Sequence, residues 1–233
     1  GLYVFFNSNN GVNGNQLANY MDANVKTARK FSKKCRILMA ESNNSKILQS
    51  SFYEIDILEI GVHHKGKRGK DSENKQPTLL ILSTLEDNNY PQYVKLHTLP
   101  NYKGEPIEEY LKEKCLFDPT IVINSDRDKA FFCLNKLAQL ENSVVDYTKE
   151  NHKLKWLNTF TGNIQSNINH LYRLVKKRDL PLFLSEQEWR INHRYSGKRI
   201  MDKVKKYIST STPVTFKQIT NSVLAYEKQF LSA

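Results

Sequence analysis

Two aspartates, Asp56 and Asp126, have the residue type and setting for metal chemistry. Asp56 interrupts a run of alternating apolar residues, and Asp126 ends a short apolar run. A carboxylate within a strand is costly unless it is paired or binds a cation. Mg²⁺ prefers oxygen ligands, and two such ions about 4 Å apart commonly serve phosphodiester chemistry. We hypothesise that the two aspartates share divalent cations; the alternative is a satisfied core aspartate or an edge strand.

The elements that carry these aspartates are predicted to be strands. Residues 52–61 alternate, with Tyr53, Ile55 and Ile57 on one side and Glu54, Asp56 and Leu58 on the other, which is typical of a strand. The apolar run 121–123 predicts a strand that is buried on both faces. Asp126 follows its carboxyl end, where α/β sheets place their ligands.

The net charge of the chain indicates which class of macromolecule it binds. The chain has 233 residues with a net charge of +11, which favours polyanions: nucleic acid first, an acidic membrane surface second. No run approaches the roughly 18 apolar residues of a membrane span, and the first residues lack the basic start of a signal peptide. Three widely spaced cysteines form no zinc pattern and are expected to be reduced thiols of an intracellular protein.

The N-terminal region predicts a helix-turn-helix. A short helix over 16–21 is followed by a break at 22–24, and Asn24 can cap a second helix over 25–40. The second helix has one apolar face and one basic face. The alternative is an ordinary helical hairpin with a solvated lysine face. The predicted DNA contacts on this helix are Lys26, Arg29, Lys30 and Lys33.

The middle of the chain adds strands, a basic loop and helices. The loop 63–72 offers Lys65, Lys67, Arg68 and Lys70 to phosphates. Strands over 78–85 and 93–99 would complete an antiparallel meander with 52–61. The further predictions are helices over 105–115 and 129–140 and a strand over 143–147.

The C-terminal third is predicted to be helical and basic. A long helix is expected within 151–177, one or two more within 182–208, and a last one over 215–230. Residues 170–206 hold 11 Lys and Arg against 4 Asp and Glu, which favours a basic groove over a merely solvated surface. Its predicted DNA contacts are Arg173, Lys176, Lys177, Arg190 and Arg194.

The expected order of elements is similar to a ribonuclease-H-like fold. This is an α/β class with a mixed sheet and flanking helices, here preceded by a small helix-turn-helix. The expected domains are residues 1–48 for DNA binding and residues 49–233 for catalysis.

With these stretches laid out, the chain resembles DDE-type insertion-sequence transposases of the ISXO-two-like group, whose eukaryotic relatives are called Merlin. The resemblance runs in order over nearly the whole chain, and a zinc ribbon that often precedes such domains has no counterpart here. The matching stretches are 10–12, 16–17, 26–28, 54–56, 66–69, 125–126, 154–159, 163–164, Glu186 and 189–194.

The resemblance implies roles for particular residues. Asp56 and Asp126 correspond to the first two catalytic carboxylates, and the third metal ligand is expected on the following helix, at Asn163 or Gln165. No acid lies between Glu150 and Asp179, and Asn158 stands where a histidine is expected.

The implied chemistry is cleavage at transposon ends and strand transfer with Mg²⁺ or Mn²⁺, two ions in all. The implied partner is double-stranded DNA, bound by a homo-oligomer with no membrane involved, in the cytoplasm and nucleoid, or in a eukaryotic nucleus. Two alternatives stay open: a catalytically impaired DNA-binding protein derived from a transposase, and a ribonuclease-H-like nuclease unconnected with transposition.

Overall fold

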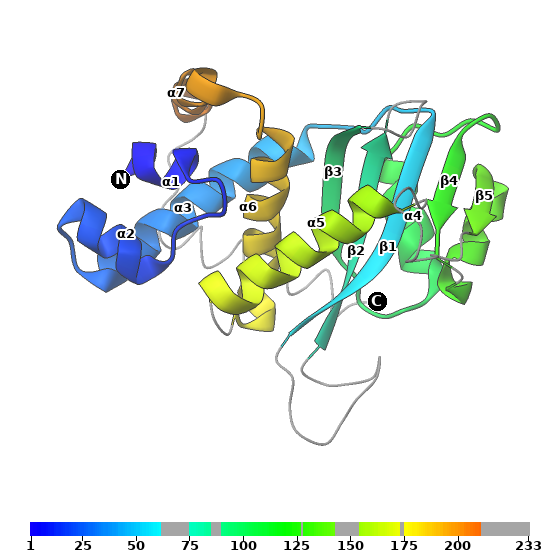
Figure 1. Cartoon of the computed structure of the whole chain (residues 1–233), viewed down its shortest axis with the longest axis horizontal. Helices are drawn as coiled ribbons and strands as arrows, with labels where there is room; N and C mark the ends of the chain where they lie inside the picture. The colour runs from blue at the N-terminus through cyan, green and yellow to red at the C-terminus, as the bar shows by residue number, and fades with distance from the viewer. Residues whose placement is uncertain (62–74, 85–89, 127, 143–153, 173–174, 211–233) are drawn as a thin grey trace. The chain divides into compact units, whose positions relative to one another are not determined.

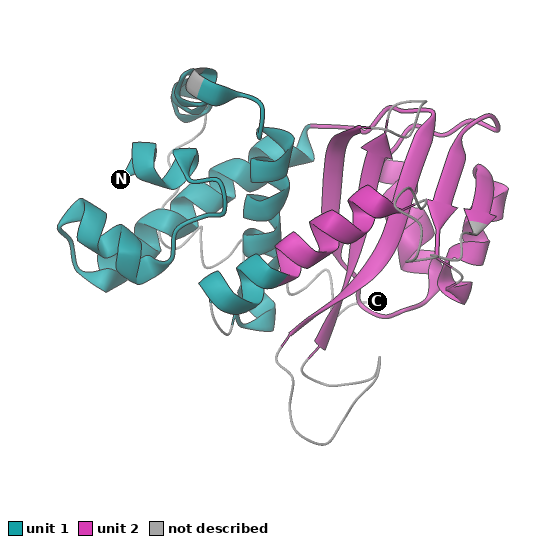
Figure 2. Cartoon of the chain, viewed as in Figure 1, with its two compact units in different colours: residues 1–45, 166–233 teal, residues 46–165 magenta. Residues whose placement is uncertain are grey.

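The computed structural model describes residues 1–61, 75–84, 90–126, 128–142, 154–172 and 175–210. By packing, the chain forms two compact units (Figure 2). Unit 1 comprises residues 1–45 and 166–233, and unit 2 comprises residues 46–165. The chain therefore leaves unit 1, builds unit 2 and returns.

Unit 2 is built on a five-stranded mixed sheet with the order β3-β2-β1-β4-β5 (Figure 1). β1 pairs antiparallel with β2 and parallel with β4, which in turn pairs parallel with β5; β2 also pairs antiparallel with β3. The ribonuclease-H-like α/β arrangement expected from the sequence is confirmed. The strands are β1 (Phe52–Gly61), β2 (Lys75–Thr84), β3 (Pro91–Thr98), β4 (Val122–Ser125) and β5 (Gln139–Asn142).

Helices cover both faces of this sheet (Figure 1). On one face, Tyr53 and Ile55 of β1 join a core with α4 (Gly104–Lys114) and the 3-10 helix η1 (Lys129–Lys136). The opposite face carries Glu54, whose side chain accepts a hydrogen bond of 3.2 Å from the backbone of α5 (Lys155–Ser166). The alternation in the sequence thus sorts β1 into an apolar face and a face that holds the acids.

One stretch after β4 differs from its prediction. The helix expected over 129–140 is a 3-10 helix that ends at Lys136, and strand β5 occupies Gln139–Asn142. The reason is pairing: Leu140 lies opposite Ile123 of β4, so residues that could extend the helix are taken into the sheet. The strand expected over 143–147 lies outside the described residues.

Unit 1 is helical. Asn13 caps α2 by accepting hydrogen bonds from two backbone N–H groups of its first turn, and Asn24 caps α3 as the sequence predicts. The two helices are compatible with a helix-turn-helix. The elements are α1 (Leu2–Asn7), α2 (Gly14–Met21), α3 (Val25–Asn44), the π-helix η2 (Asn167–Leu171), the 3-10 helix η3 (Lys177–Asp179), α6 (Leu180–Asn192), the 3-10 helix η4 (Gly197–Arg199) and α7 (Ile200–Thr210).

A buried ion cluster ties α3 to α6. Glu186 is fully buried and accepts hydrogen bonds from Arg36 Nε (2.6 Å), Arg190 Nη2 (2.6 Å) and the Tyr172 hydroxyl (2.7 Å). Burial by itself raises the pKa of the Glu186 carboxyl, but the two guanidinium groups outweigh burial and the net shift is downward. The carboxylate is therefore ionised and compensated.

The backbone at Gly11 packs directly against this cluster. Its φ of +102° is in a region that L side chains rarely adopt, and a Cβ there would lie 1.8 Å from the Tyr172 hydroxyl. Only glycine allows the backbone before α2 to approach the Tyr172–Glu186 pair so closely.

The packing units differ from the division into 1–48 and 49–233 expected from the sequence. The first boundary lies close to residue 45, where unit 1 first ends. The difference comes at the C-terminal side, because Trp189 of α6 and Val204 of α7 share one core with Phe5, Phe6 and other residues of the N-terminal helices. Division by function, with catalysis over 49–233, stays a prediction.

Candidate active site

Asp56 and Asp126 occupy equivalent positions on neighbouring parallel strands. The last recorded pair between β1 and β4 joins Ile55 to Ser125, and each aspartate is the next residue. Neighbouring strands lie about 4.8 Å apart, so the fold brings the backbones of these two residues side by side from 70 residues apart in the sequence. Asp56 shares its face of β1 with Glu54, the face that α5 covers.

Backbone groups orient one oxygen of each carboxylate. Asp56 Oδ1 accepts a hydrogen bond from the Ile57 N–H (2.7 Å), and Asp126 Oδ1 accepts one from the Asp128 N–H (3.1 Å). These contacts restrict carboxylate rotation, which favours a preorganised site.

The two amides proposed as a third ligand are placed differently from each other. Asn163 of α5 is exposed, and its side chain forms no hydrogen bond with any residue that the structure describes. Gln165 is half-buried, and its Nε2 donates to the Glu59 carbonyl (3.4 Å), three residues beyond Asp56 on β1. That bond leaves the Gln165 Oε1 available as an oxygen ligand.

Three further polar atoms lie on this side of unit 2, and the sequence analysis singled out only Asn158 among their residues. Asn124 Oδ1, Asn158 Nδ2 and Thr161 Oγ1 are buried without a hydrogen-bond partner in the described part of the chain. Asn124 pairs in register with Glu54, and Asn158 follows the residue whose N–H binds Glu54. The available signal was periodicity, because Asn124 lies two residues before Asp126 and so shares its face.

This donor set fits a hard divalent cation. Two carboxylates on adjacent strands and an orphaned buried amide oxygen, Asn124 Oδ1, are the oxygen ligands that Mg²⁺ prefers. Among the described residues no group of three or more His, Cys, Asp or Glu could hold a metal. Any cation held here therefore needs amide or water oxygens besides the aspartates.

Two other carboxylates of β1 are engaged within unit 2. Glu59 forms an ion pair with Lys75 and accepts a hydrogen bond from the Tyr102 hydroxyl (3.2 Å). Glu54, 1% exposed, accepts the backbone bond from Leu157. Both contacts fasten neighbouring elements to β1, so we assign these acids a structural role.

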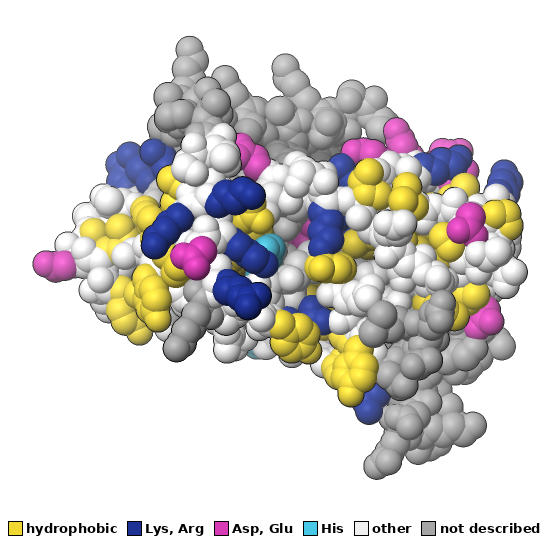
Figure 3. Space-filling view, turned by 90° about the horizontal axis from the view of Figure 1, so that it is seen from above, with side chains coloured by type: hydrophobic (Ala, Val, Ile, Leu, Met, Phe, Trp, Pro, Cys, Tyr) yellow, Lys and Arg dark blue, Asp and Glu magenta, His cyan; other side chains and the backbone are white. Residues whose placement is uncertain are grey.

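Apart from Arg190 and Arg194, the predicted DNA-contacting residues divide into three groups. Lys26, Arg29, Lys30, Lys176 and Lys177 are exposed, and Figure 3 shows Lys and Arg side chains gathered over unit 1 on one face. Lys33 is partly buried and pairs with Asp179 (3.3 Å). Lys65, Lys67, Arg68, Lys70 and Arg173 lie outside the described residues.

Arg190 is a core residue, contrary to the prediction that it contacts DNA. It is 7% exposed, pairs with Glu186, and donates to the carbonyls of Ser8 and Phe5 (2.7 Å for Phe5). Its donors are thus engaged within unit 1, and we leave it out of the proposed DNA contacts. Arg194 is half-buried, with its guanidinium 4.6 Å from the centre of the Tyr195 ring.

The family model of the ISXO2-like transposase domain matches residues 50–192. This chain belongs to that family. The match runs from the start of β1 to the end of α6, so the transposase domain includes Asp56, Asp126 and α5 and extends into the helices of unit 1. A search of curated proteins finds no match to the chain. No helix of this transposase among the described residues is both long and apolar enough to cross a membrane.

Proposed function

We propose that this transposase cuts DNA at the ends of an insertion sequence and joins the freed 3′ hydroxyl groups to target DNA. The observation that carries the proposal is the pairing of β1 with β4, which sets Asp56 beside Asp126. The family supplies the transposase role, and the two carboxylates supply the chemistry that such a role needs.

Asp56 and Asp126 would hold the divalent cations, Mg²⁺ or Mn²⁺. Bound there, the cations would lower the pKa of the attacking hydroxyl and stabilise the leaving oxygen. The carboxylates, oriented by the N–H groups of Ile57 and Asp128, would keep the site preorganised. Asn163 and Gln165 remain the proposed third ligands, with Asn124 as an added candidate on β4.

The exposed cations of unit 1 would bind phosphates of double-stranded DNA. Lys26, Arg29 and Lys30 lie on the first turns of α3, and Lys176 and Lys177 lie at η3. Cations that neutralise phosphates release counterions from the DNA, so the affinity of the protein for DNA should fall steeply as the salt concentration rises. We further propose that a homo-oligomer holds both ends together during transfer.

Cleavage of DNA that carries the element's own ends tests the proposal. We expect strand cleavage with Mg²⁺ or Mn²⁺, and a loss of roughly a thousandfold or more in Asp56→Asn and Asp126→Asn, since removal of a metal ligand removes the transition-state stabilisation that the cation supplies. Asp118→Asn is a matched control, because Asp118 is exposed and precedes β4 at its other end. Equal cleavage by the native chain and both site variants would refute the proposal.

The third ligand can be assigned with the same substrate. Gln165→Ala, Asn163→Ala and Asn124→Ala each remove one amide, and the ligand is the one whose loss raises the Mn²⁺ concentration needed for half-maximal cleavage. A variant that only distorts the fold would lower the rate at every Mn²⁺ concentration instead.

A DNA-binding protein without catalysis is the second candidate. The observation that favours it is α5, which carries no acid over Lys155–Ser166 and so adds no third negative charge to the site. In that case the chain would bind the element's ends with a strong salt dependence, and no cation would induce cleavage.

A further inference from the structure

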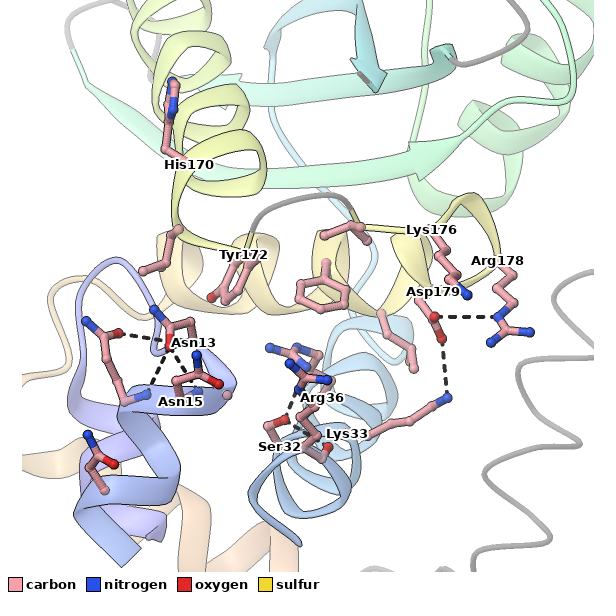
Figure 4. Close-up of a pocket in the computed structure, with 18 residues that line it drawn as sticks. Asn13, Asn15, Ser32, Lys33, Arg36, His170, Tyr172, Lys176, Arg178 and Asp179 are labelled. Atoms are coloured by element: carbon pink, nitrogen blue, oxygen red, sulfur yellow. Dashed lines mark hydrogen bonds and ion pairs between the residues drawn. The ribbon is translucent and has the colours of Figure 1, made fainter. Parts of the chain in front are cut away.

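A groove in unit 1 combines cations, amides and a buried guanidinium. Its volume is about 730 Å³. Residues of α2 form one wall, one face of α3 forms the floor, and the segment 175–183 forms the other wall (Figure 4). All of the lining residues belong to unit 1.

Arg36 is the central side chain of the floor. Only 8% of its side chain is exposed, and the guanidinium lies 3.8 Å from the centre of the Phe183 ring. Nε donates to Glu186 and Nη1 donates to Ser32 Oγ (3.3 Å). Its Nη2 has no acceptor among the residues that the structure describes, and Arg36 lines the groove. A nine-tenths buried guanidinium with an unused donor edge is a site for an anion.

The rim adds charge of the same sign. Arg29, Lys33, Lys176 and Arg178 line the groove, and Asp179 is the one acid among the lining residues. Asp179 is already shared between Lys33 (3.3 Å) and Arg178 (3.6 Å). The groove therefore keeps a positive excess after its internal pairs are formed, which focuses the field on whatever enters.

The α2 wall offers hydrogen-bonding groups of another kind. The side-chain oxygen of Asn13 accepts the hydrogen bonds that cap α2. The side-chain amides of Asn15 and Asn19 form no hydrogen bond with any described residue. Asn side chains can pair with base edges. One wall thus suits a base, while the floor and the other wall suit its phosphate.

The shape favours an unpaired strand over a duplex. A duplex is read by a protein element that protrudes into one of its grooves. The guanidinium of Arg36 is recessed, so a DNA duplex cannot bring its phosphate backbone into contact with this guanidinium. An unpaired nucleotide rotates freely and can enter a charged groove.

We propose that the groove formed by α2, α3 and residues 175–183 binds an unpaired nucleotide of a DNA strand, with its phosphate at Arg36. The proposal deepens the DNA binding proposed above, but it does not depend on cleavage. Its occupant is the strand next to a duplex end, where base pairing is lost.

Fluorescence anisotropy of the full chain in EDTA tests it, with a blunt duplex and the same duplex extended by an unpaired 3′ overhang of four nucleotides. The groove variant is Arg29→Gln with Lys176→Gln, since both side chains are exposed and line the groove. The matched control is Lys26→Gln with Lys34→Gln, which removes the same charge from exposed positions of α3 that do not line it.

The native chain is expected to bind the overhang substrate roughly tenfold more tightly than the blunt one, because of the added phosphate and base contacts. The groove variant should lose this preference. The control variant should bind both substrates more weakly by the same factor and should therefore keep the preference for the overhang. A native chain without preference, or a groove variant that keeps it, overturns the proposal. Cleavage by the aspartate site is measured separately with Mg²⁺, so either idea can fail alone.

Discussion

The two units treat buried charge in opposite ways. In unit 1, Glu186 is fully buried and has two guanidinium groups and a phenol within hydrogen-bond reach. In unit 2, strand pairing sets one carboxylate beside another, and Asp126 forms no ion pair with any described residue. The first arrangement is compensated within the chain, whereas at the second we propose that a divalent cation binds.

This contrast separates structure from function. A compensated cluster fixes which helices pack together, and only the Nη2 edge of Arg36 is left for a ligand among the described residues. A like-charged pair costs stability and persists where chemistry requires it. The free energy of unfolding of single variants distinguishes the two kinds of site.

Removing the central acid of unit 1 should be the most damaging change. Glu186→Ala leaves Arg36 and Arg190 buried without their carboxylate, and we expect a loss of about 3–5 kcal/mol in urea unfolding followed by circular dichroism. Asp179→Ala is the control, because its pairs are partly exposed and contribute less than about 1 kcal/mol. Similar losses in the two variants would contradict the contrast.

Filling the space above the cluster should come next. Gly11→Ala places a Cβ against the Tyr172 hydroxyl at a backbone conformation that alanine rarely adopts, and we expect a loss of about 2–4 kcal/mol. Combining it with Tyr172→Phe removes the clashing oxygen. In a double-mutant cycle the two changes should then cost less together than their separate losses predict.

The pH dependence of unit 2 should reflect His97. Burial lowers its pKa to about 4, with Lys114 acting in the same direction and Glu113 opposing. The folded state therefore disfavours the charged imidazole, and this contribution is fully present above the unfolded pKa of about 6.5. It is lost as the pH falls from there towards 4.

We expect a loss of about 2 kcal/mol over that interval, allowing for the partial exposure of the ring. His97→Phe keeps the stacking on Tyr110, whose ring centre lies 4.0 Å away, and should remove the dependence between pH 6.5 and 4.5. A dependence that persists in this variant would assign the effect to other groups.

The smallest effect on stability is expected at the candidate active site. Asp126→Asn removes one of two neighbouring negative charges and should change the free energy of unfolding without cation by less than about 1 kcal/mol. Mn²⁺ should raise the melting temperature of the native chain because it binds only the folded site, and it should leave Asp126→Asn unchanged. An equal shift in both would place the cation elsewhere.

The sequence predicted unit 2 well where the pattern that identifies an element lies within that element. Alternation over Phe52–Gly61 identified β1 together with the face of Asp56, and Asp126 was expected at the carboxyl end of β4. β5 was missed because a four-residue strand has too few positions to show a period, and Leu140 joins the sheet through pairing that is remote in sequence.

Unit 1 was predicted less well because its organising contacts span the whole chain. Arg36 and Glu186 are 150 residues apart, and nothing in the composition of α3 separates a buried arginine from the exposed ones beside it. Arg190 was taken for a DNA contact for the same reason: a basic stretch shows charge, but not which side chain turns inward. The capping residues Asn13 and Asn24 act within one turn, and Asn24 was predicted correctly.

The order of the units along the chain has a consequence for synthesis on the ribosome. The first 45 residues emerge early, yet Glu186 and Trp189, which complete their core, follow only after the whole of unit 2. The nascent sheet can form before Glu186 has been synthesised, while the Arg36 side chain is still solvated and has no carboxylate partner. Truncation after α5 would thus leave a complete sheet attached to N-terminal helices whose core lacks Trp189 and Val204.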